Sequence, residues 1–528
     1  MARAGVGLGG PLEAPEGRWE PGGEWAAAGA GAAGARVLGG LGPAPPRLTA
    51  GADTGCPGGG EDRDGGDGAA RTPPLLAAST GEALHFLRQR RPDATGGARL
   101  APLRELSLPG AAGQASCTAL AAKNPGDCRG LLVGLTGGDV LCLDLEQQLG
   151  GGGSARKLVG EATFQPGPAA VAGPERRCTC LAWAPQSPGS FVAGYGDGSL
   201  RLFQKPLGWG AGPEGDGGGE TTAAGAKVGP SFCWQVTCGA AITALAFSGD
   251  GQLLGVASRD GIFRVLDVDD GTLVAGCRSY YGGFLCLAWS PDSRFVALGG
   301  EDDLLSVYSV VDRCIVVWGD GHRSWVTGCA WDPWWKAPRR DGREASSVGA
   351  SAVGSDTDEG TTYRIVSVAQ DTQLLFWDFE PPESENMPEH RRAPSMTSLP
   401  VPLSPSHATA TGLHRRAASR SSDVSGWSRT PSFSGLPAGE DSLEGDMEGL
   451  SFAEQHQCIA ASVPRDEMLW MVPAAQVRAH QTPVCDVHVL QQGVATLCAE
   501  SRLRLWLRPT SASAVPVEGG GVEPAKEG

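Results

Sequence analysis

A histidine, a serine and an aspartate stand in one region of the chain as His322, Ser367 and Asp371, and a tryptophan follows at Trp377. The first three are the residue types of a nucleophilic triad, in which a carboxylate orients a histidine that takes the proton of a serine hydroxyl. The same side chains can instead hydrogen-bond to one another inside a sheet, with the indole N–H as a further donor. The elements that carry them decide between these two uses.

Short segments of alternating apolar and polar residues surround the four, at 326–331, 363–368 and 374–377. Alternation with a period of two, interrupted by Gly- and Asp-rich turns, predicts antiparallel strands. The histidine then precedes the first strand, the serine lies on the second, the aspartate occupies the next turn, and the tryptophan lies on the third. With Gly321 before the histidine and Asp378 after the tryptophan, this order is typical of a WD repeat, a four-stranded propeller blade.

We therefore interpret the four residues as a buried structural network and not as a catalytic triad, since a buried polar set orders a blade when all its members are satisfied. The alternative is a core histidine, a turn aspartate and a core tryptophan that occur together by chance.

A related unit recurs about seven times: a strand of small residues, a tight turn, and an alternating strand that carries a large apolar residue. The turn residue is Thr80, Gly137, Asp197, Asp260, Asp302, Asp371 or Glu500, and six positions later stands Phe86, Leu143, Phe203, Leu266, Tyr308, Trp377 or Trp506. The sequence thus predicts an all-β WD-repeat β-propeller with seven blades. Because closure removes exposed strand edges, we expect strands from both ends of the chain to close the ring.

Composition divides the chain into packed and unpacked parts, since 80 glycines and 39 prolines among 528 residues concentrate outside the alternating segments. Segments of that kind bury too little apolar surface to offset their ordering entropy. The predicted division is a disordered Gly/Ala/Pro-rich tail at 1–73, a first part of the propeller at 74–379, a disordered Ser/Pro/Arg-rich insertion at 380–455, a closing part at 456–510, and a disordered tail at 511–528.

Charge and hydropathy exclude several classes of protein. The net charge of −16 comes without a basic stripe, which disfavours nucleic-acid binding. Apolar runs are too short for a membrane-spanning helix, and the first residues do not have the apolar core of a secretory signal. Fifteen cysteines without a Cys-x-x-Cys pair fit buried thiols in a reducing compartment. We expect a cytoplasmic or nuclear protein.

The usual signatures of catalysis, cofactor binding and metal binding are absent from the sequence. It contains no phosphate-binding Gly-x4-Gly-Lys-Ser/Thr loop, no His-Glu-x-x-His and no Gly-x-Ser-x-Gly. We predict no enzymatic activity, no cofactor and no metal ion. A propeller without an acid–base cluster is typically a platform for other proteins.

Three segments resemble one family in particular: SYYGGFLCLAWSPDSRFVALGGEDDLLSVYS, GDGHRSWV and AQDTQLLFWD. They are similar to the dystrophia myotonica WD-repeat family, which includes the fungal catabolite-repression protein CreC and animal activators of ubiquitin-specific proteases. The resemblance covers most of the predicted propeller and none of the N-terminal tail. It implies a non-catalytic scaffold that binds a deubiquitinase and activates or stabilises it. A second WD-repeat scaffold is a further expected partner.

The resemblance also implies a contact site, because an aromatic residue of the SYFGG segment and the tryptophan of GHKSWV look like the family's protease-contacting residues. They match Tyr281 and Trp325, where Tyr281 stands in place of a phenylalanine. Both lie in loops that precede the first strands of consecutive blades, and such loops emerge on one face of a ring. With Tyr280 they predict an exposed aromatic patch of the kind enriched at hot spots. The alternative is that the three rings cover the seam between blades.

The 380–455 insertion contains two serines that follow paired arginines, Ser395 and Ser419. This spacing suits a basophilic kinase, and a phosphate there would create an anionic docking point. An unmodified low-complexity loop is the equal alternative.

Two other functions compete with the deubiquitinase scaffold. A ubiquitin-ligase substrate receptor typically carries Trp-Asp-x-Arg at a blade end, whereas this chain has Trp-Asp-Phe-Glu at 377–380. An enzyme that uses the central channel needs carboxylates or histidines there, and the predicted first strands carry almost none.

Overall fold

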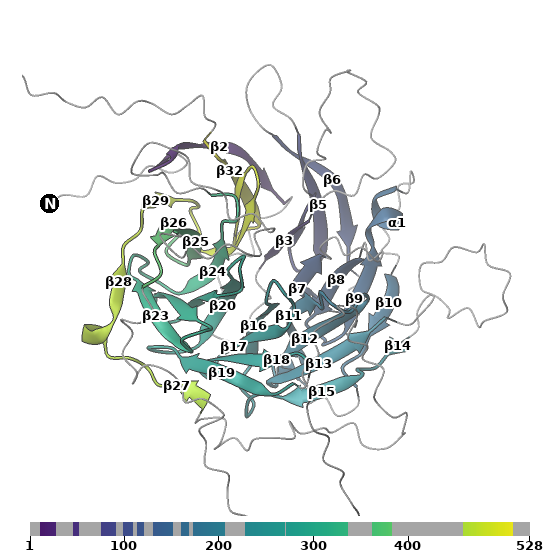
Figure 1. Cartoon of the computed structure of the whole chain (residues 1–528). Coiled ribbons are helices and arrows are strands. Elements are labelled where there is room, and N and C mark those ends of the chain that lie inside the picture. The colour runs from purple at the N-terminus through teal and green to yellow at the C-terminus, as the bar shows by residue number, and fades with distance from the viewer. Residues whose placement is uncertain are drawn as a thin grey trace, which may run out of the picture.

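The computed structural model describes residues 11–27, 46–51, 75–90, 99–108, 113–120, 130–150, 160–167, 173–205, 227–269, 271–335, 362–382 and 458–509. Within this part, seven antiparallel sheets stand around a common centre, each with a strand at the inside and a strand at the rim (Figure 1). The fold is therefore an all-β propeller of seven blades, as the recurring units predict.

Blades 1 to 4 are numbered in chain order of their inner strands. Blade 1 contains β3 (Arg47–Gly51), β4 (Leu75–Ser79), β5 (Ala83–Arg90) and β6 (Arg99–Ser107); blade 2 contains β7 (Ala115–Leu120), β8 (Gly130–Leu135), β9 (Val140–Asp144), β10 (Gly160–Phe164) and β14 (Lys227–Val228); blade 3 contains β11 (Cys178–Trp183), β12 (Ser190–Tyr195), β13 (Ser199–Gln204) and β15 (Phe232–Gln235); blade 4 contains β16 (Ile242–Phe247), β17 (Leu253–Ser258), β18 (Ile262–Asp267), β19 (Leu273–Arg278) and β27 (Ile459–Ala460).

Blades 5 to 7 follow the same plan. Blade 5 contains β20 (Phe284–Trp289), β21 (Phe295–Gly300), β22 (Leu305–Ser309), β23 (Cys314–Gly319) and β28 (Leu469–Met471); blade 6 contains β24 (Val326–Trp331), β25 (Tyr363–Ala369), β26 (Gln373–Phe379) and β29 (Ala475–Arg478); blade 7 contains β30 (Val484–Leu490), β31 (Gly493–Cys498), β32 (Arg502–Leu507), β2 (Gly17–Ala26) and β1 (Leu12–Ala14). The helical elements are α1 (Leu145–Gly150) and two 3-10 turns, Pro174–Arg176 and Arg465–Glu467.

The large apolar residue of every predicted unit lies in the core. All seven are buried, from Phe86 in blade 1 to Trp506 in blade 7. Each stands on the third strand of its blade, where it fills the space between neighbouring sheets. The spacing of turn and apolar residue in the sequence therefore identified all seven blades.

Two kinds of hydrogen bond tie the inner strands of neighbouring blades together. An indole N–H at the end of an inner strand donates to a carbonyl of the preceding blade, and a hydroxyl near its start donates to a carbonyl of the following blade. The indole bonds are Trp183 to Ala119 (3.1 Å), Trp289 to Ala246 (2.9 Å) and Trp331 to Ala288 (2.9 Å); the hydroxyl bonds are Ser116 to Cys178 (2.5 Å), Thr243 to Phe284 (2.6 Å) and Thr327 to Val484 (2.6 Å). Both kinds of bond occur at the seam of blades 2 and 3 and at that of blades 4 and 5, so these seams are fixed at both ends.

The ring closes through an N-terminal hairpin, made of β1 and β2, that pairs with the C-terminal strand β32. Closure by both ends of the chain is confirmed, but the predicted disorder of 1–73 is wrong for residues 12–26. Glu16 of the hairpin turn accepts two hydrogen bonds, of 2.6 and 3.0 Å, from the buried guanidinium of Arg364. Trp19 packs on Phe376 with ring centroids 5.0 Å apart. The hairpin therefore joins blade 7 to blade 6.

The predicted tail contains a third strand, since residues 47–51 form β3, the inner strand of blade 1. The sequence RLTAG has no apolar alternation that marks it as a strand. The segment forms a strand because the open edge of β4 offers it a full row of backbone hydrogen-bond partners. The sequence of the segment alone does not show that edge. The rest of 1–73 lies outside the described residues.

The described part of the chain resumes at Cys458, on the outside of blade 4. From there the chain passes blade 5 before it reaches blade 6, which it completes. Residues 458–474, which we call the outer strap, add β27 parallel to β19 and then β28 parallel to β23 before the chain becomes β29 of blade 6. Figure 1 shows the strap along the rim of these blades. The predicted closing part at 456–510 thus covers two blades before it completes the last two.

Within the described residues, no helix is long and apolar enough to cross a membrane. Ser395, Ser419 and almost all of the 380–455 insertion lie outside those residues, as does the 511–528 tail, and their assignments stay predictions.

Candidate functional site

The four residues of the predicted network come together in blade 6. The Nε1–H of Trp377 donates to Ser367 Oγ at 2.8 Å, and Ser367 Oγ lies 2.8 Å from His322 Nε2. On the other side of the imidazole, His322 Nδ1 lies 3.1 Å from Asp371 Oδ2. These distances form one chain of donors: the indole N–H to the serine oxygen, the serine O–H to Nε2, and Nδ1–H to the carboxylate.

The network is closed to solvent and electrically paired. His322, Ser367 and Trp377 are buried. Burial acts to raise the pKa of Asp371, but the hydrogen bond and charge of His322, with the N–H groups of Arg323 and Gln373, hold that pKa below its ordinary value. A serine whose hydroxyl and oxygen are both engaged inside a blade has no access to a substrate. The network therefore holds β24, β25 and β26 together.

The tyrosine loop, residues 279–283, joins β19 of blade 4 to β20 of blade 5. Glu301 Oε2 accepts the N–H of Gly283 at 3.0 Å, and Ser279 Oγ donates to the carbonyl of Gly282 at 2.5 Å. Gly282 has φ +65° and lies so close to Glu301 that an added Cβ would stand 2.8 Å from that side chain. A residue with a side chain would be strained there on both counts. The glycines of SYYGG and the glutamate of GGEDD thus fix one loop.

Asp302 lies below the same loop. Its Oδ1 accepts the N–H of Leu304 at 3.2 Å, while Oδ2 is buried without a hydrogen-bond partner in the described part of the chain. Burial raises the pKa of Asp302 to about 6, and the N–H groups of Leu304, Tyr280 and Tyr281 that face the carboxylate offset only part of that rise. The N–H groups of the tyrosine loop therefore stabilise the charged form of Asp302 less than its burial destabilises it.

The loop presents its two tyrosines differently. Tyr281 is 72% exposed and Tyr280 is 44% exposed. The ring of Tyr280 packs edge-on against buried Trp318, with centroids 5.4 Å apart, and so covers part of blade 5. The ring of Tyr281 is mostly exposed and does not cover the blade in this way. The alternative, in which the rings cover the seam between blades, therefore fits Tyr280 in part and does not fit Tyr281.

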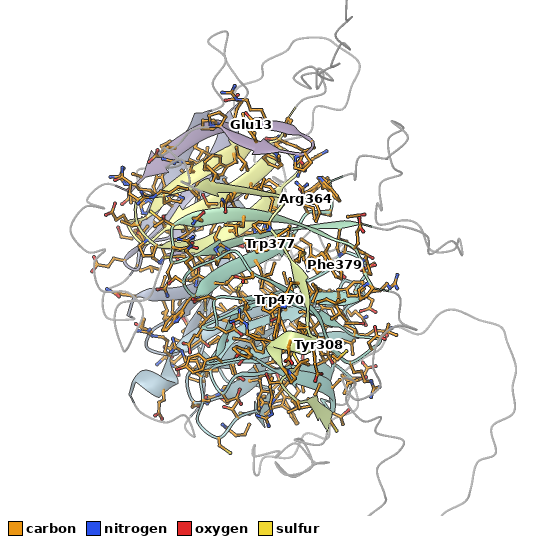
Figure 2. The ribbon with its side chains drawn as sticks, turned by 90° about the vertical axis from the view of Figure 1, so that its left-hand side faces the viewer. Glu13, Tyr308, Arg364, Trp377, Phe379 and Trp470 are labelled. Atoms are coloured by element: carbon orange, nitrogen blue, oxygen red, sulfur yellow. The ribbon has the colours of Figure 1, made fainter. Side chains whose placement is uncertain are left out.

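The outer strap extends this aromatic surface in a way that sequence reasoning missed. Trp470 on β28 packs on Trp318 at 5.6 Å and is itself 40% exposed (Figure 2). The guanidinium of Arg465 lies 5.0 Å from the Trp470 ring and 5.6 Å from the Tyr280 ring. Nothing local marks Trp470 as a neighbour of Tyr280, because nearly two hundred positions separate them in the sequence.

Trp325 begins blade 6 as Tyr281 begins blade 5, in the loop between β23 and β24. Its side chain is half-buried, and its carbonyl accepts the N–H of Gln370 at 3.1 Å. Both loops run from the rim strand of one blade to the inner strand of the next, so both open on the same face of the ring. We call this the Tyr281 face. Tyr280 lies on Trp318, and a continuous patch of Tyr280, Tyr281 and Trp325 stays a prediction.

Among the described residues, no group of three or more histidine, cysteine, aspartate or glutamate side chains is arranged to hold a metal ion. The carboxylates of the Tyr281 face instead contact backbone N–H groups and arginines, as Glu301 does with Arg259 at 3.3 Å. The chemistry available on this face is recognition through rings and charges.

Comparisons with known proteins found a family model, a relative and a solved structure that are similar to this chain. Residues 231–292 match the model of the anaphase-promoting complex subunit 4 WD40 domain. The WD repeat-containing protein 20 homolog of Caenorhabditis elegans is 36% identical over 172 residues, which is 30% of this chain and 22% of that protein's length. A chain in the crystal structure of the mitotic checkpoint complex aligns with a TM-score of 0.45 and 13% identity, covering 82% of this chain and 84% of its own.

This chain is a WD40-repeat protein, and its propeller is the kind of fold that serves as a platform for other proteins. The matched stretch spans about a fifth of the length of the nematode relative.

Proposed function

We propose that this protein binds a ubiquitin-specific protease through the Tyr281 face and activates or stabilises it without catalysis of its own. The observation that carries the proposal is the exposure of Tyr281, 72%, on a loop whose backbone Glu301 holds in place. An exposed ring on a fixed loop binds with little loss of conformational freedom, which is what makes aromatic residues effective anchors.

Two further features support this assignment. The loop belongs to the SYYGG and GGEDD segments, which carry the resemblance to the protease-activating WD-repeat family, and Trp325 of the GHRSWV segment opens on the same face. The triad-like residues of blade 6 hydrogen-bond to one another in a buried network. We therefore assign binding to the Tyr281 face and not to these residues. A cytoplasmic or nuclear location, where such proteases act, is part of the proposal.

The test is affinity capture from a cell lysate with the full chain and three variants. Tyr281→Ala and Trp325→Ala remove the proposed anchors, and we expect each to reduce capture of a ubiquitin-specific protease by at least about tenfold, the loss typical of a hot-spot residue. Val311→Ala is the matched control, since Val311 is equally exposed, 72%, in the turn between β22 and β23 at the opposite end of blade 5.

The outcomes separate the parts of the proposal. Capture by the wild type and by Val311→Ala, lost in the two aromatic variants, supports both partner and face. Capture that persists in all variants keeps the partner and rejects the face. Failure of the wild type to capture any such protease rejects the function.

A further inference from the structure

The outermost strand of blade 5 has an edge without a neighbouring strand in the described part of the chain. β28 pairs with β23 on one side and is the last strand of its sheet (Figure 1). The carbonyl of Met471 accepts the N–H of Asp320 at 3.1 Å, so Met471 directs its main-chain groups inward, to β23. Because these groups alternate in direction along a strand, the N–H and C=O of Trp470 point outward. Neither group forms a hydrogen bond within the described residues.

The side chains along this edge are apolar and exposed. Leu469 is 50% exposed, Trp470 is 40% exposed and Val472 is 76% exposed. Soluble proteins usually protect an exposed apolar edge with a lysine, a proline or a bulge, because such an edge pairs readily with another strand. Residues 469–472 contain neither lysine nor proline, and the pairing of β28 with β23 has no bulge. The edge is therefore built to accept a strand and not to repel one.

The edge is complementary to itself. When a second β28 lies antiparallel to the first with the two Trp470 residues opposite each other, each Trp470 N–H can donate to the carbonyl of the other. In this register Leu469 lies opposite Met471 of the second copy. Val472 likewise lies opposite Met468, so all these facing pairs are apolar. The arrangement has a twofold axis, which is the commonest symmetry of protein dimers.

The charges of the outer strap also allow a second copy to bind. Arg465, Asp466 and Glu467 come directly before the apolar run, and the residues from Met468 to Pro473 are all uncharged. In the antiparallel register the two acids face Pro473 and the residue after it, so no carboxylate meets another carboxylate. A different partner would have to supply an uncharged strand of the same length, whereas each copy of this chain already carries one.

We propose that two copies of this protein associate through β28, antiparallel about a twofold axis at Trp470, and so join their two blade 5 sheets into one. The contact does not depend on the proposed function. An edge of this length buries a small area, so the dimer is weak and forms at concentrations on the order of 10 µM and above.

Sedimentation velocity of the full chain measures the association. We expect the dimer fraction to rise as the concentration increases from about 1 to about 100 µM. It should also rise as salt is added, because each copy carries a net charge of −16 and salt screens the repulsion between copies. A chain that stays monomeric at the highest concentration, or a dimer that dissociates as salt is added, would overturn the inference.

Two valine variants locate the contact. Val472→Lys places a charge opposite Met468 of the second copy, and we expect the dissociation constant to rise at least about tenfold. Val311→Lys is the matched control, since Val311 is 72% exposed in the turn between β22 and β23, away from the edge strand of the same blade. It should associate as the wild type does. Association that is equally strong, or equally weakened, in both variants would place the contact elsewhere and reject β28.

Hydrogen–deuterium exchange of the strap identifies what covers the edge. The amide of Trp470 should exchange at least about threefold more slowly at 100 µM than at 1 µM, and Val472→Lys should remove this difference. Equal protection at both concentrations would mean that a segment of the same chain, outside the described residues, pairs with β28. An absence of protection at both would mean that nothing does. Either result would overturn a second copy as the occupant.

Discussion

Blades 5 and 6 are neighbours with the same strand order, but they use one set of positions in opposite ways. His322, Ser367, Asp371 and Trp377 of blade 6 correspond by their places relative to the strands to Tyr280, Leu298, Asp302 and Tyr308 of blade 5. Of the four residue types, blade 5 keeps only the aspartate.

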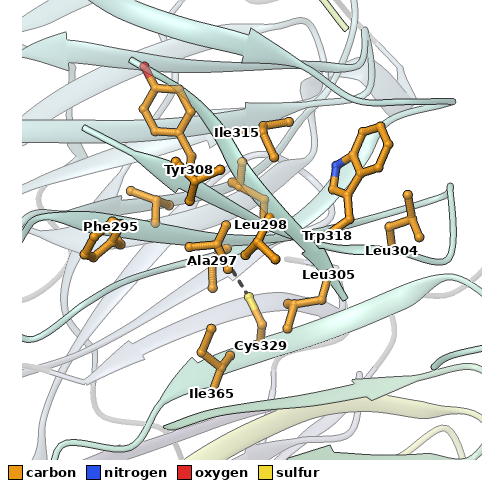
Figure 3. Packing of buried hydrophobic residues seen from close by; sticks show 14 of the residues in the cluster. Phe295, Ala297, Leu298, Leu304, Leu305, Tyr308, Ile315, Trp318, Cys329 and Ile365 are labelled. Carbon is orange, nitrogen blue, oxygen red and sulfur yellow. Dashed lines mark hydrogen bonds between the residues drawn. The ribbon is translucent and has the colours of Figure 1, made fainter. Parts of the chain in front are cut away.

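The exchange of histidine for Tyr280 changes what happens to the aspartate and to the loop. In blade 6 the histidine turns inward and hydrogen-bonds to Asp371. In blade 5 the tyrosine lies outside on Trp318, and Oδ2 of Asp302 is buried without a hydrogen-bond partner among the described residues. Figure 3 shows Leu298 packed in the blade 5 core near side chains such as Leu305, and a leucine has no hydroxyl to continue a network. A blade without this hydrogen-bond network can thus present its loop to a partner.

The largest difference between the blades is expected from removing one hydroxyl in each. Ser367→Ala leaves the N–H of Trp377 and Nε2 of His322 buried without a partner, so the free energy of unfolding should fall by about 2–4 kcal/mol. Ser306→Ala in blade 5 removes a buried hydroxyl that has no partner and should change it by less than about 0.5 kcal/mol. Urea unfolding monitored by tryptophan fluorescence measures both. Equal effects in the two blades would contradict the comparison.

A smaller difference is expected from removing the charge of the turn aspartate. Asp371→Asn breaks the pairing with His322 and should lower the free energy of unfolding by about 1–2 kcal/mol at pH 7. Asp302→Asn removes a charge that is buried without a partner, so stability at pH 7 should be unchanged or higher by on the order of 1 kcal/mol. A loss of stability in Asp302→Asn as large as that in Asp371→Asn would show that Asp302 has a partner after all.

The pH dependence of the two aspartates should have opposite signs. The folded pKa of Asp302, about 6, lies above the ordinary aspartate value of 3.8, so its contribution to stability is fully present below pH 3.8 and is lost as pH rises through 6. The folded pKa of Asp371 is lowered, so its contribution is present above pH 3.8 and is lost as pH falls. The difference in stability between wild type and each asparagine variant, measured from about pH 2 to 7, isolates these contributions.

The smallest effect is expected from Tyr280→His, which places the histidine of blade 6 at the matching position of blade 5. A histidine there can pair with Asp302 and should move the pH at which the Asp302 contribution is lost to a lower value. The overall stability should change by less than about 1 kcal/mol, because Leu298 still offers no hydroxyl and the contact with Trp318 is lost. The same pH series on this variant and on Tyr280→His/Asp302→Asn measures the shift, and an unchanged profile would contradict it.

The local sequence determined the blades themselves. A tight turn followed six positions later by a large apolar residue is set by neighbours in the chain, because turn geometry and strand alternation are local properties. The four residues of the blade 6 network were recognised for the same reason, since their order along three consecutive strands already brings them together. The loops of Tyr281 and Trp325 could be placed on one face from that order alone.

Tertiary structure alone decided what closes and covers the ring. Residues 12–26 and 47–51 have the composition of a tail, and they become strands because blades 7 and 1 offer open edges to pair with. The outer strap passes two blades that are distant in sequence, and there Trp470 packs on Trp318 while Arg465 lies over the rings of Trp470 and Tyr280. Backbone pairing depends on which strand edge is left free and not on the side chains of the segment that pairs with it. No local sequence pattern therefore predicts the strands at 12–26 and 47–51 or the path of the outer strap.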